Sequence, residues 1–418
     1  MTDPDVERHQ LRAEVAHWRH AIEALADLDT VAPSEAWAGL EEYVRMRLRG
    51  PLGAAVTALA LETAGLDAAL AAGGDLVRAR QRLLQLRQRY LQVETVLDFY
   101  GDAVATRTNP QLAAVLRGLD TLAADSLDVV LRPLGIDAPP ALVYLDKGLG
   151  ASILRAGVRL WDQTSVSPVA AIKMTRHNLD HPTSLLHEVG HQVFHLCGWV
   201  DELAATLHAT LARHSSELAD VWRSWASEVA ADVHAFVQTG WAPLPALANV
   251  VDGSTPAVYR LIPGDPHPFA WVRVMLNVEL CRSWYGAGPW DLLARAWWER
   301  HPPERAPGEI GALARASVNA LGEIVDLCTR RPAQAFGGRP LHSLADPRRV
   351  APAALDRLAT QAGPSLLTSR YLARREPLRI LAWLATRATV DPAQAPVHHR
   401  QLQGWLTRLA TEPLARSA

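Results

Sequence analysis

The segment TSLLHEVGHQVFHL, residues 183–196, carries two histidines and a glutamate within five positions: His187, Glu188 and His191. In a helix, residues four apart lie one turn apart on one face, so both imidazoles can reach the same ion. A histidine pair at this spacing arises easily by chance in a chain with 16 histidines. A glutamate directly after the first histidine makes chance a much rarer explanation. The pattern therefore favours a metal site over an ordinary helix that carries polar residues.

The same five residues resemble the HExxH signature of zinc peptidases. In that chemistry two neutral imidazoles bind Zn²⁺, and the ion lowers the pKa of a bound water and polarises the scissile carbonyl. The glutamate takes a proton from the water and later delivers it to the leaving amine. The resemblance therefore implies that His187 and His191 are zinc ligands and that Glu188 is the general base.

A catalytic zinc needs a third protein ligand and an open coordination position. The metzincin arrangement fails, because it needs glycine and histidine where this chain has Phe194 and Cys197. His195 lies one further turn along the helix, too far from His187 for all three imidazoles to share one ion. The third ligand must therefore come from another part of the chain.

In gluzincins the third ligand is a glutamate on a following helix, often with an aspartate four residues later. The segment SWASEVAADVHAF, residues 224–236, is similar to this element and implies that Glu228 binds the zinc. Asp232 would then accept a hydrogen bond from the second ring nitrogen of a zinc histidine. Apolar neighbours indicate a buried helix, where unpaired acids would be costly. Two surface acids are the alternative reading, and Glu202 and Glu217 are the other candidate ligands.

A third segment, HPFAWVR at 267–273, is similar to the His-Pro…Arg element of gluzincins of the CAAX-processing peptidase type. That resemblance implies that His267 and Arg273 face the substrate or support the zinc glutamate, whereas the alternative is a helix that begins at Pro268. The membrane helices of those relatives are absent, so their substrate and location do not transfer. Tyr259 is a candidate oxyanion donor, since gluzincins often use a tyrosine or histidine there; a core tyrosine is the alternative.

Mainly helical structure is expected to position these residues. Over residues 1–135 apolar side chains recur at helical spacing, and one seam at 83–104 alternates steps of three and four for about three heptads. An antiparallel bundle within the chain and a dimerising coiled coil both explain that seam. Three short β-prone runs predict a small sheet before the metal motif: residues 141–146, a run around 158–161, and residues 168–179.

The fold class that follows is mainly α, with a zincin-like catalytic unit and a small β-sheet. We expect a helical bundle domain at 1–135, a metallopeptidase domain at 136–300 and a C-terminal helical region at 301–418. Lys and Arg number 42 against 44 Asp and Glu, which argues against a broad nucleic-acid or anionic-membrane surface. Three widely spaced cysteines and a start without a signal-peptide pattern favour the cytoplasm.

The sequence thus predicts a zinc metallopeptidase, a hydrolase with Zn²⁺ as cofactor and a peptide or protein as substrate. We expect no nucleic-acid or membrane partner, and a monomer is favoured. Two alternatives stay open at this point. One is a helical scaffold or binding protein that keeps the zinc fold without turnover, and the other is a zinc hydrolase of a non-peptide amide.

Overall fold

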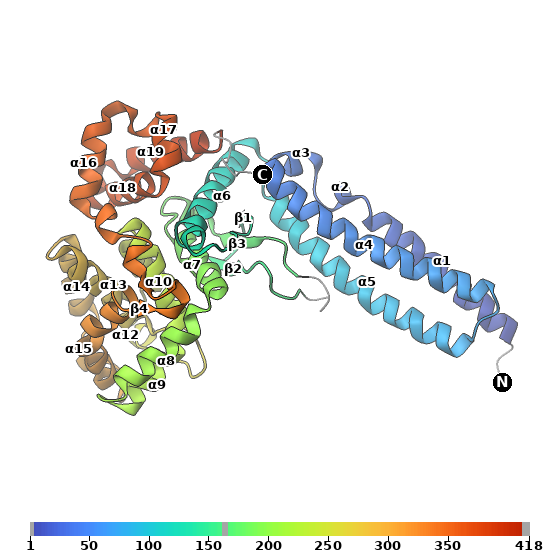
Figure 1. Ribbon diagram of the computed structural model, residues 1–418, viewed down its shortest axis with the longest axis horizontal. Coiled ribbons are helices and arrows are strands. Elements are labelled where there is room, and N and C mark those ends of the chain that lie inside the picture. The colour runs from blue at the N-terminus through green and yellow to red at the C-terminus, as the bar shows by residue number, and fades with distance from the viewer. Residues whose placement is uncertain (1–3, 161–165, 412–418) are drawn as a thin grey trace. The chain divides into compact units, whose positions relative to one another are not determined.

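The computed structural model describes residues 4–160 and 166–411. Nineteen α-helices and a small mixed sheet of three strands occur among these residues, so the prediction of a mainly α fold is confirmed (Figure 1). The chain divides into two compact units. The first comprises residues 1–117, 139–144 and 154–171, and the second comprises residues 118–138, 145–153 and 172–418. This division differs from the expected three regions, because residues on both sides of position 300 belong to one unit.

The first unit is built on three long helices that pack along one another (Figure 1). Two short helices join the first long helix to the second. Asp75 begins the third long helix, because its side chain accepts hydrogen bonds from the amides of Val77 and Arg78. The helices of this unit are α1 (Pro4–Leu25), α2 (Leu28–Val31), α3 (Ser34–Ala38), α4 (Glu42–Ala71) and α5 (Leu76–Ala105).

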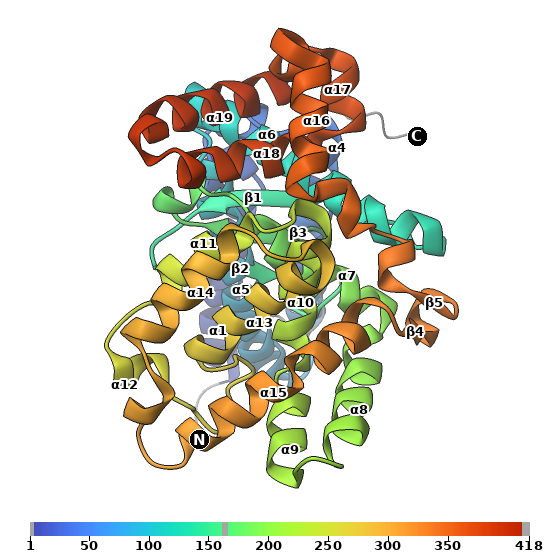
Figure 2. The same ribbon diagram turned by 90° about the vertical axis from the view of Figure 1, so that its left-hand side faces the viewer.

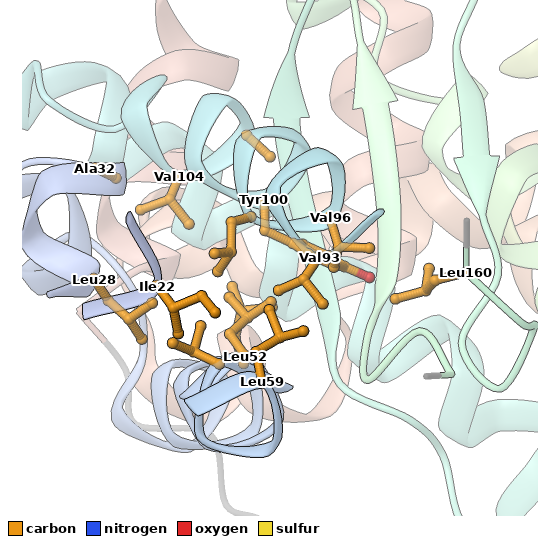
Figure 3. Packing of buried hydrophobic residues seen from close by; sticks show 14 of the residues in the cluster. Ile22, Leu28, Ala32, Leu52, Leu59, Val93, Val96, Tyr100, Val104 and Leu160 are labelled. Carbon is orange, nitrogen blue, oxygen red and sulfur yellow. The ribbon is translucent and has the colours of Figure 1, made fainter. Parts of the chain in front are cut away.

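The heptad seam of the sequence lies within α5 and faces the interior of this bundle. Six of its seven residues are buried, and Tyr90 is half-buried. The seam contributes to one apolar cluster with buried side chains of α1 and α4, including Ile22, Leu52 and Leu59 (Figure 3). The chain therefore covers this seam with its own helices, as the reading of an intrachain bundle expects.

Helix α4 is the one helix among the described residues that is long and apolar enough to cross a membrane by length and composition. This is weak evidence, because a core helix of a soluble protein passes the same test. One face of α4 is buried in the bundle, with Leu48, Leu52 and Leu59 almost fully enclosed. Leu61, on another face, is 71% exposed.

The sheet has the strand order β1-β3-β2. Its strands are β1 (Ala141–Leu145), β2 (Ser152–Leu154) and β3 (Ala170–Met174). The runs predicted at 141–146 and 168–179 contain β1 and β3. The third strand lies earlier than the run around 158–161, where only an isolated bridge joins Arg159 to Val166. A turn at Gly157, which has a φ of 80°, separates β2 from that run, and residue 161 lies outside the described part of the chain.

Helices make up most of the second unit. They are α7 (Ser184–Cys197), α8 (Trp199–Leu211), α9 (Ser216–Ser224), α10 (Ala226–Thr239), α11 (Pro243–Val251), α12 (Thr255–Val258), α13 (Ala270–Tyr285), α14 (Pro289–Arg300), α15 (Ile310–Thr329), α16 (Pro352–Ala362), α17 (Arg370–Arg375), α18 (Pro377–Val390) and α19 (Ala395–Leu409). Helix α6 (Pro110–Leu131) carries residues of both units, and strands β4 (Pro332–Ala333) and β5 (Arg339–Pro340) form a small antiparallel pair. Helix α10 packs against α7 and α13, and the three gather in the middle of this unit (Figure 2).

Candidate metal centre

Helices α7 and α10 approach each other closely at Gly190. A Cβ atom at this position would lie 2.9 Å from the Cα of Ala231 and 2.9 Å from the Cβ of His234. Such contacts are too short for any side chain, so glycine is required where the two backbones meet. This close approach brings the histidine face of α7 against the acidic face of α10.

Apolar packing fixes the rotation of both helices. The residues of α7 around the two histidines are buried, namely Leu185, Leu186, Val189, Val193 and Phe194. Helix α10 is buried over almost its whole length, and Glu228 and Asp232 are each only 5% exposed. Helix α7 ends at Gly198, which adopts the left-handed conformation. The polar side chains between the helices consequently have little freedom to turn towards solvent.

The structure brings together the three residues that the sequence proposed as ligands. One donor atom from each of His187, His191 and Glu228 lies within 4.8 Å of the others. Nε2 of His187 is 3.3 Å from Oε2 of Glu228, and Nε2 of His191 is 3.2 Å from Oε1. Two imidazole nitrogens and a carboxylate form a donor set that suits Zn²⁺. The cluster therefore fits a metal ion held by these three side chains.

The other two candidate ligands lie elsewhere. The carboxylate of Glu202 accepts hydrogen bonds from the backbone amides of Gln334 and Ala335, at 2.7 and 2.9 Å. Glu217 is exposed in the first turn of α9. Neither belongs to the cluster of possible metal ligands.

The second nitrogen of each imidazole has its own partner. Nδ1 of His187 lies 2.8 Å from Oδ1 of Asp232, and Nδ1 of His191 lies 3.3 Å from the hydroxyl oxygen of Ser227. These contacts turn the Nε2 atoms towards Glu228 and fix the tautomer that a metal needs. Sequence reasoning missed Ser227, for which the only signal was its place directly before Glu228.

Arg273 and Asn277, on α13, support the acidic side of the cluster. Nε and Nη2 of Arg273 both lie 2.8 Å from oxygens of Asp232, and Nη2 is also 3.3 Å from Oε2 of Glu228. The side chain of Asn277 donates to the backbone carbonyl of Arg273 at 3.1 Å. Arg273 thus holds the two carboxylates in place, and it is one of the residues that the sequence singled out.

The charged side chains of the cluster shift one another's pKa values. Burial alone would raise the pKa of Asp232 and of Glu228. At Asp232 this effect is outweighed by Arg273, and at Glu228 it is outweighed by His187 and His191, so both pKa values lie well below their usual range. Burial would lower the pKa of His187, but Asp232 and Glu228 reverse that effect and raise it. The two ionised carboxylates therefore face Arg273 and a positively charged His187, whose proton a metal ion would replace.

Glu188 lies beside the cluster without belonging to it. The residue is 7% exposed. Burial raises the pKa of its carboxyl, while His187 and His191 act in the opposite direction. A buried carboxylate with a raised pKa accepts a proton more readily than an exposed one, which is what a general base requires.

His267 lies at the exposed side of the cluster, with a side chain that is 55% exposed. Its Nε2 is 3.5 Å from Oε1 of Glu228, and its Nδ1 is 2.6 Å from Oδ1 of Asp265. The same oxygen of Asp265 accepts a hydrogen bond from the backbone amide of His267. Asp265 was not identified from the sequence, although an aspartate two residues before a candidate histidine is a local signal for such a turn.

Tyr259 is not brought to the cluster. Its side chain is fully buried, its hydroxyl donates to the carbonyl of His301 at 2.7 Å, and its ring stacks on Trp271. The hydroxyl thus already makes a structural hydrogen bond. The geometry favours the alternative of a core tyrosine over that of an oxyanion donor.

Comparison with protein families, with curated proteins and with solved structures gives no match for this chain.

Proposed function

We propose that this chain is a zinc-dependent hydrolase that cleaves peptide bonds. The observation that carries the proposal is the convergence of donor atoms from His187, His191 and Glu228 within 4.8 Å of one another. Glu188 supports it, because a buried glutamate that is not among the ligands lies next to the two histidines in the chain. This combination of ligands and base is the one that metal-dependent amide hydrolysis uses.

When bound, zinc would lower the pKa of a water molecule and polarise the carbonyl of the scissile bond. Glu188 accepts the proton of the attacking water and returns it to the leaving nitrogen. Asp232 and Ser227 keep the imidazoles oriented through their Nδ1 atoms, and Arg273 holds Asp232. The supporting shell therefore consists of side chains whose own positions are fixed by burial and by hydrogen bonds.

His267 is the residue best placed to stabilise negative charge on the substrate oxygen. Asp265 holds its Nδ1 side, and its Nε2 lies 3.5 Å from Oε1 of Glu228 at the exposed side of the cluster. A donor that is fixed before the reaction stabilises an oxyanion without reorganisation during it. We assign this role to His267 in place of Tyr259.

The proposal is tested by metal analysis together with a digest of proteome-derived peptides. Wild-type protein should contain about one zinc ion per chain. The variant Glu188→Gln keeps the size of the side chain but cannot take up the proton, so it should retain zinc and lose cleavage by several orders of magnitude. Glu217→Gln, at an exposed glutamate, is the matched control and should cleave at the wild-type rate.

Two results would overturn the proposal. The first is a protein that binds no zinc even after zinc is added back. The second is a cleavage activity that Glu188→Gln retains in full. Zinc binding without cleavage of any peptide would instead favour the non-catalytic scaffold or a hydrolase of a non-peptide amide, and a screen of small amides separates these two.

A further inference from the structure

His267 belongs to a segment that joins α11 to α13, residues 252–269, which we call the strap. The strap is buried at two places, residues 258–259 and residues 268–269. Residues 260–267 between these places form the strap tip, which is exposed or half-buried and has neither helix nor strand. The position of His267, at the end of the tip, therefore depends on the contacts that fix the two buried places.

His301, directly after α14 and only 2% exposed, holds the first half of the strap at three points. Its Nδ1 lies 3.1 Å from Oγ1 of Thr255, and its Nε2 lies 3.0 Å from Oδ1 of Asp252. Its backbone carbonyl accepts a hydrogen bond from the hydroxyl of Tyr259 at 2.7 Å. An imidazole with a proton on Nε2 donates to the carboxylate and accepts from the hydroxyl of Thr255, so one tautomer satisfies both side-chain contacts. A single buried residue thus holds three residues of the strap.

Tyr259 extends this restraint to the second buried place of the strap. Its ring stacks on Trp271 with centroids 5.7 Å apart, and it also contacts the ring of Phe269, with centroids 6.0 Å apart. Aromatic rings at these separations stabilise one another beyond the area that they bury. Phe269 is the N-cap residue of α13 and follows His267 by two positions. The aromatic contacts therefore join the two ends of the strap tip, and the hydroxyl of Tyr259 ties them to His301.

We propose that His301 is a positioning residue for His267, an inference that rests on the proposed function. By fixing both ends of the strap tip, His301 places Nε2 of His267 at the exposed side of the metal cluster, 3.5 Å from Oε1 of Glu228. A hydrogen-bond donor stabilises an oxyanion most effectively when it is held in place before the reaction, and a displacement of about 1 Å can cost a large part of the rate. The contacts of His301 described above involve none of the proposed metal ligands. Its loss should therefore displace His267 and leave the metal ligands in place.

Hydrogen exchange tests the structural part of the proposal on the zinc-loaded full chain, without any substrate. Amides of the strap that donate hydrogen bonds report on its opening. They include those of Val258, Tyr259, Arg260, Asp265 and His267. His301→Ala should increase their exchange rates by about tenfold, the effect of losing one buried hydrogen bond. Peptides from α10 should exchange as in wild type, and the zinc content should be unchanged. His208→Ala, at an exposed histidine of α8, is the matched control and should leave the exchange of the strap unchanged.

A double-variant cycle tests the kinetic part of the proposal. His267→Ala should lower kcat by about 10²–10³-fold, the range typical for the loss of one oxyanion donor. His301→Ala should lower kcat by about tenfold with little change in KM, because it displaces His267 without removing it. The protein with both substitutions should cleave as fast as His267→Ala alone, since His301 acts through His267. A purely structural role of His301 would instead multiply the two losses.

Tyr259→Phe and Thr255→Val take the place of His301→Ala if that variant fails to fold. Each removes one hydroxyl contact with His301 and keeps the shape of the side chain. Each should therefore act in the same direction as His301→Ala, with a smaller effect.

Three results would overturn the proposal. The strap could exchange at the wild-type rate in His301→Ala, which would mean that His301 does not fix it. The losses of the two single variants could multiply in the double variant, which would mean that His301 acts independently of His267. Folded His301→Ala could lose its zinc, which would place its effect at the metal ligands. If wild type cleaves no peptide, the proposed function is wrong, and the exchange rates still decide whether His301 fixes the strap.

Discussion

Oδ1 of Asp232 lies 2.8 Å from Nδ1 of His187, and the same carboxylate is held by two nitrogens of Arg273, also at 2.8 Å. The imidazole is therefore fixed through the nitrogen that faces away from Glu228. The arrangement links α7, α10 and α13 through three side chains that are each at most 15% exposed. It makes the orientation of one proposed ligand depend on a residue that does not touch the proposed metal position.

This dependence predicts the effect of Asp232→Asn. The amide oxygen can still accept a hydrogen bond from His187, but the negative charge is lost, so zinc affinity should fall by about 10–100-fold. Competition with a chromophoric zinc chelator measures the change. Asp220→Asn is the matched control, because Asp220 also contacts a histidine, His208 at 3.2 Å, but on the surface. Equal losses in the two variants would contradict the prediction.

Glu228→Ala should reduce zinc binding far more than Asp232→Asn, because it removes a proposed ligand and not a support. Glu202→Ala provides the contrast. It should leave zinc binding intact and lower the free energy of unfolding by about 1–2 kcal/mol, since the amides of Gln334 and Ala335 lose their acceptor. Metal content and thermal unfolding of the same samples test both statements. A Glu202→Ala protein without zinc would show that the ligand assignment is wrong.

The sequence predicted those parts of the site that helix geometry determines. His187 and His191 must share a face once α7 is helical, and the same holds for Glu228 and Asp232 on α10. Ser227 and Asp265 escaped prediction, because their contacts depend on the rotation of α10 and on a turn before α13. No periodicity encodes either of these.

Tertiary packing determines further features that the sequence alone did not settle. Tyr259 had two readings, and its contact with the carbonyl of His301 follows from the way that the end of α12 meets the end of α14. The third strand lies at 152–154, on the other side of a turn at Gly157 from the run that looked β-prone. The division into two units could not be predicted either, because the first unit is assembled from three separate stretches of the chain.

The contact at Gly190 predicts a stability difference between two glycine substitutions. Gly190→Ala would place a Cβ 2.9 Å from the Cα of Ala231, so α7 and α10 must move apart, at a cost of about 1–3 kcal/mol. Gly404→Ala, in α19, meets nothing within 4 Å and should stabilise the protein by about 0.5–1 kcal/mol. Urea unfolding measures both values. The idea fails if the two alanine variants are equally stable.

The seam in α5 predicts that a charge has very different effects on stability at two nearby leucines. Leu86 is fully buried and Leu84 is 49% exposed. Leu86→Glu should therefore lower the free energy of unfolding by several kcal/mol, because it buries a charge, whereas Leu84→Glu should change it by less than about 0.5 kcal/mol. Light scattering should show a monomer at micromolar concentration for wild type. A dimer that Leu86→Glu and Val93→Glu dissolve without unfolding would favour the coiled coil.

His234, on α10, belongs to a buried hydrogen-bond network that reaches α7. Its Nδ1–H donates to the carbonyl of Leu186 at 2.8 Å, and its Nε2 accepts from the side-chain amide of Gln238 at 2.9 Å. The hydroxyl of Ser126 donates to Oε1 of Gln238 at 2.6 Å. Protonation of His234 at Nε2 would place its N–H opposite the side-chain N–H of Gln238, so that two donors would face each other. Burial, the largest cause, lowers the pKa of His234 from 6.5 to about 4.

Because the folded protein keeps His234 neutral, the unfolded chain takes up the proton first as the pH falls. The contribution of this residue to stability is therefore complete above pH 6.5 and is lost as the pH falls from 6.5 to about 4. The total loss amounts to about 3 kcal/mol. Protonation of Glu228 and Asp232 also lowers the free energy of unfolding in acid. Wild type is therefore compared with His234→Gln, a variant that retains both carboxylates. Urea unfolding of both proteins is measured in the presence of a zinc chelator. Wild type should have the higher free energy of unfolding at neutral pH, and the difference from His234→Gln should shrink towards pH 4. A stability difference that stays constant over this range would mean that the pKa of His234 is the same in the folded and the unfolded protein.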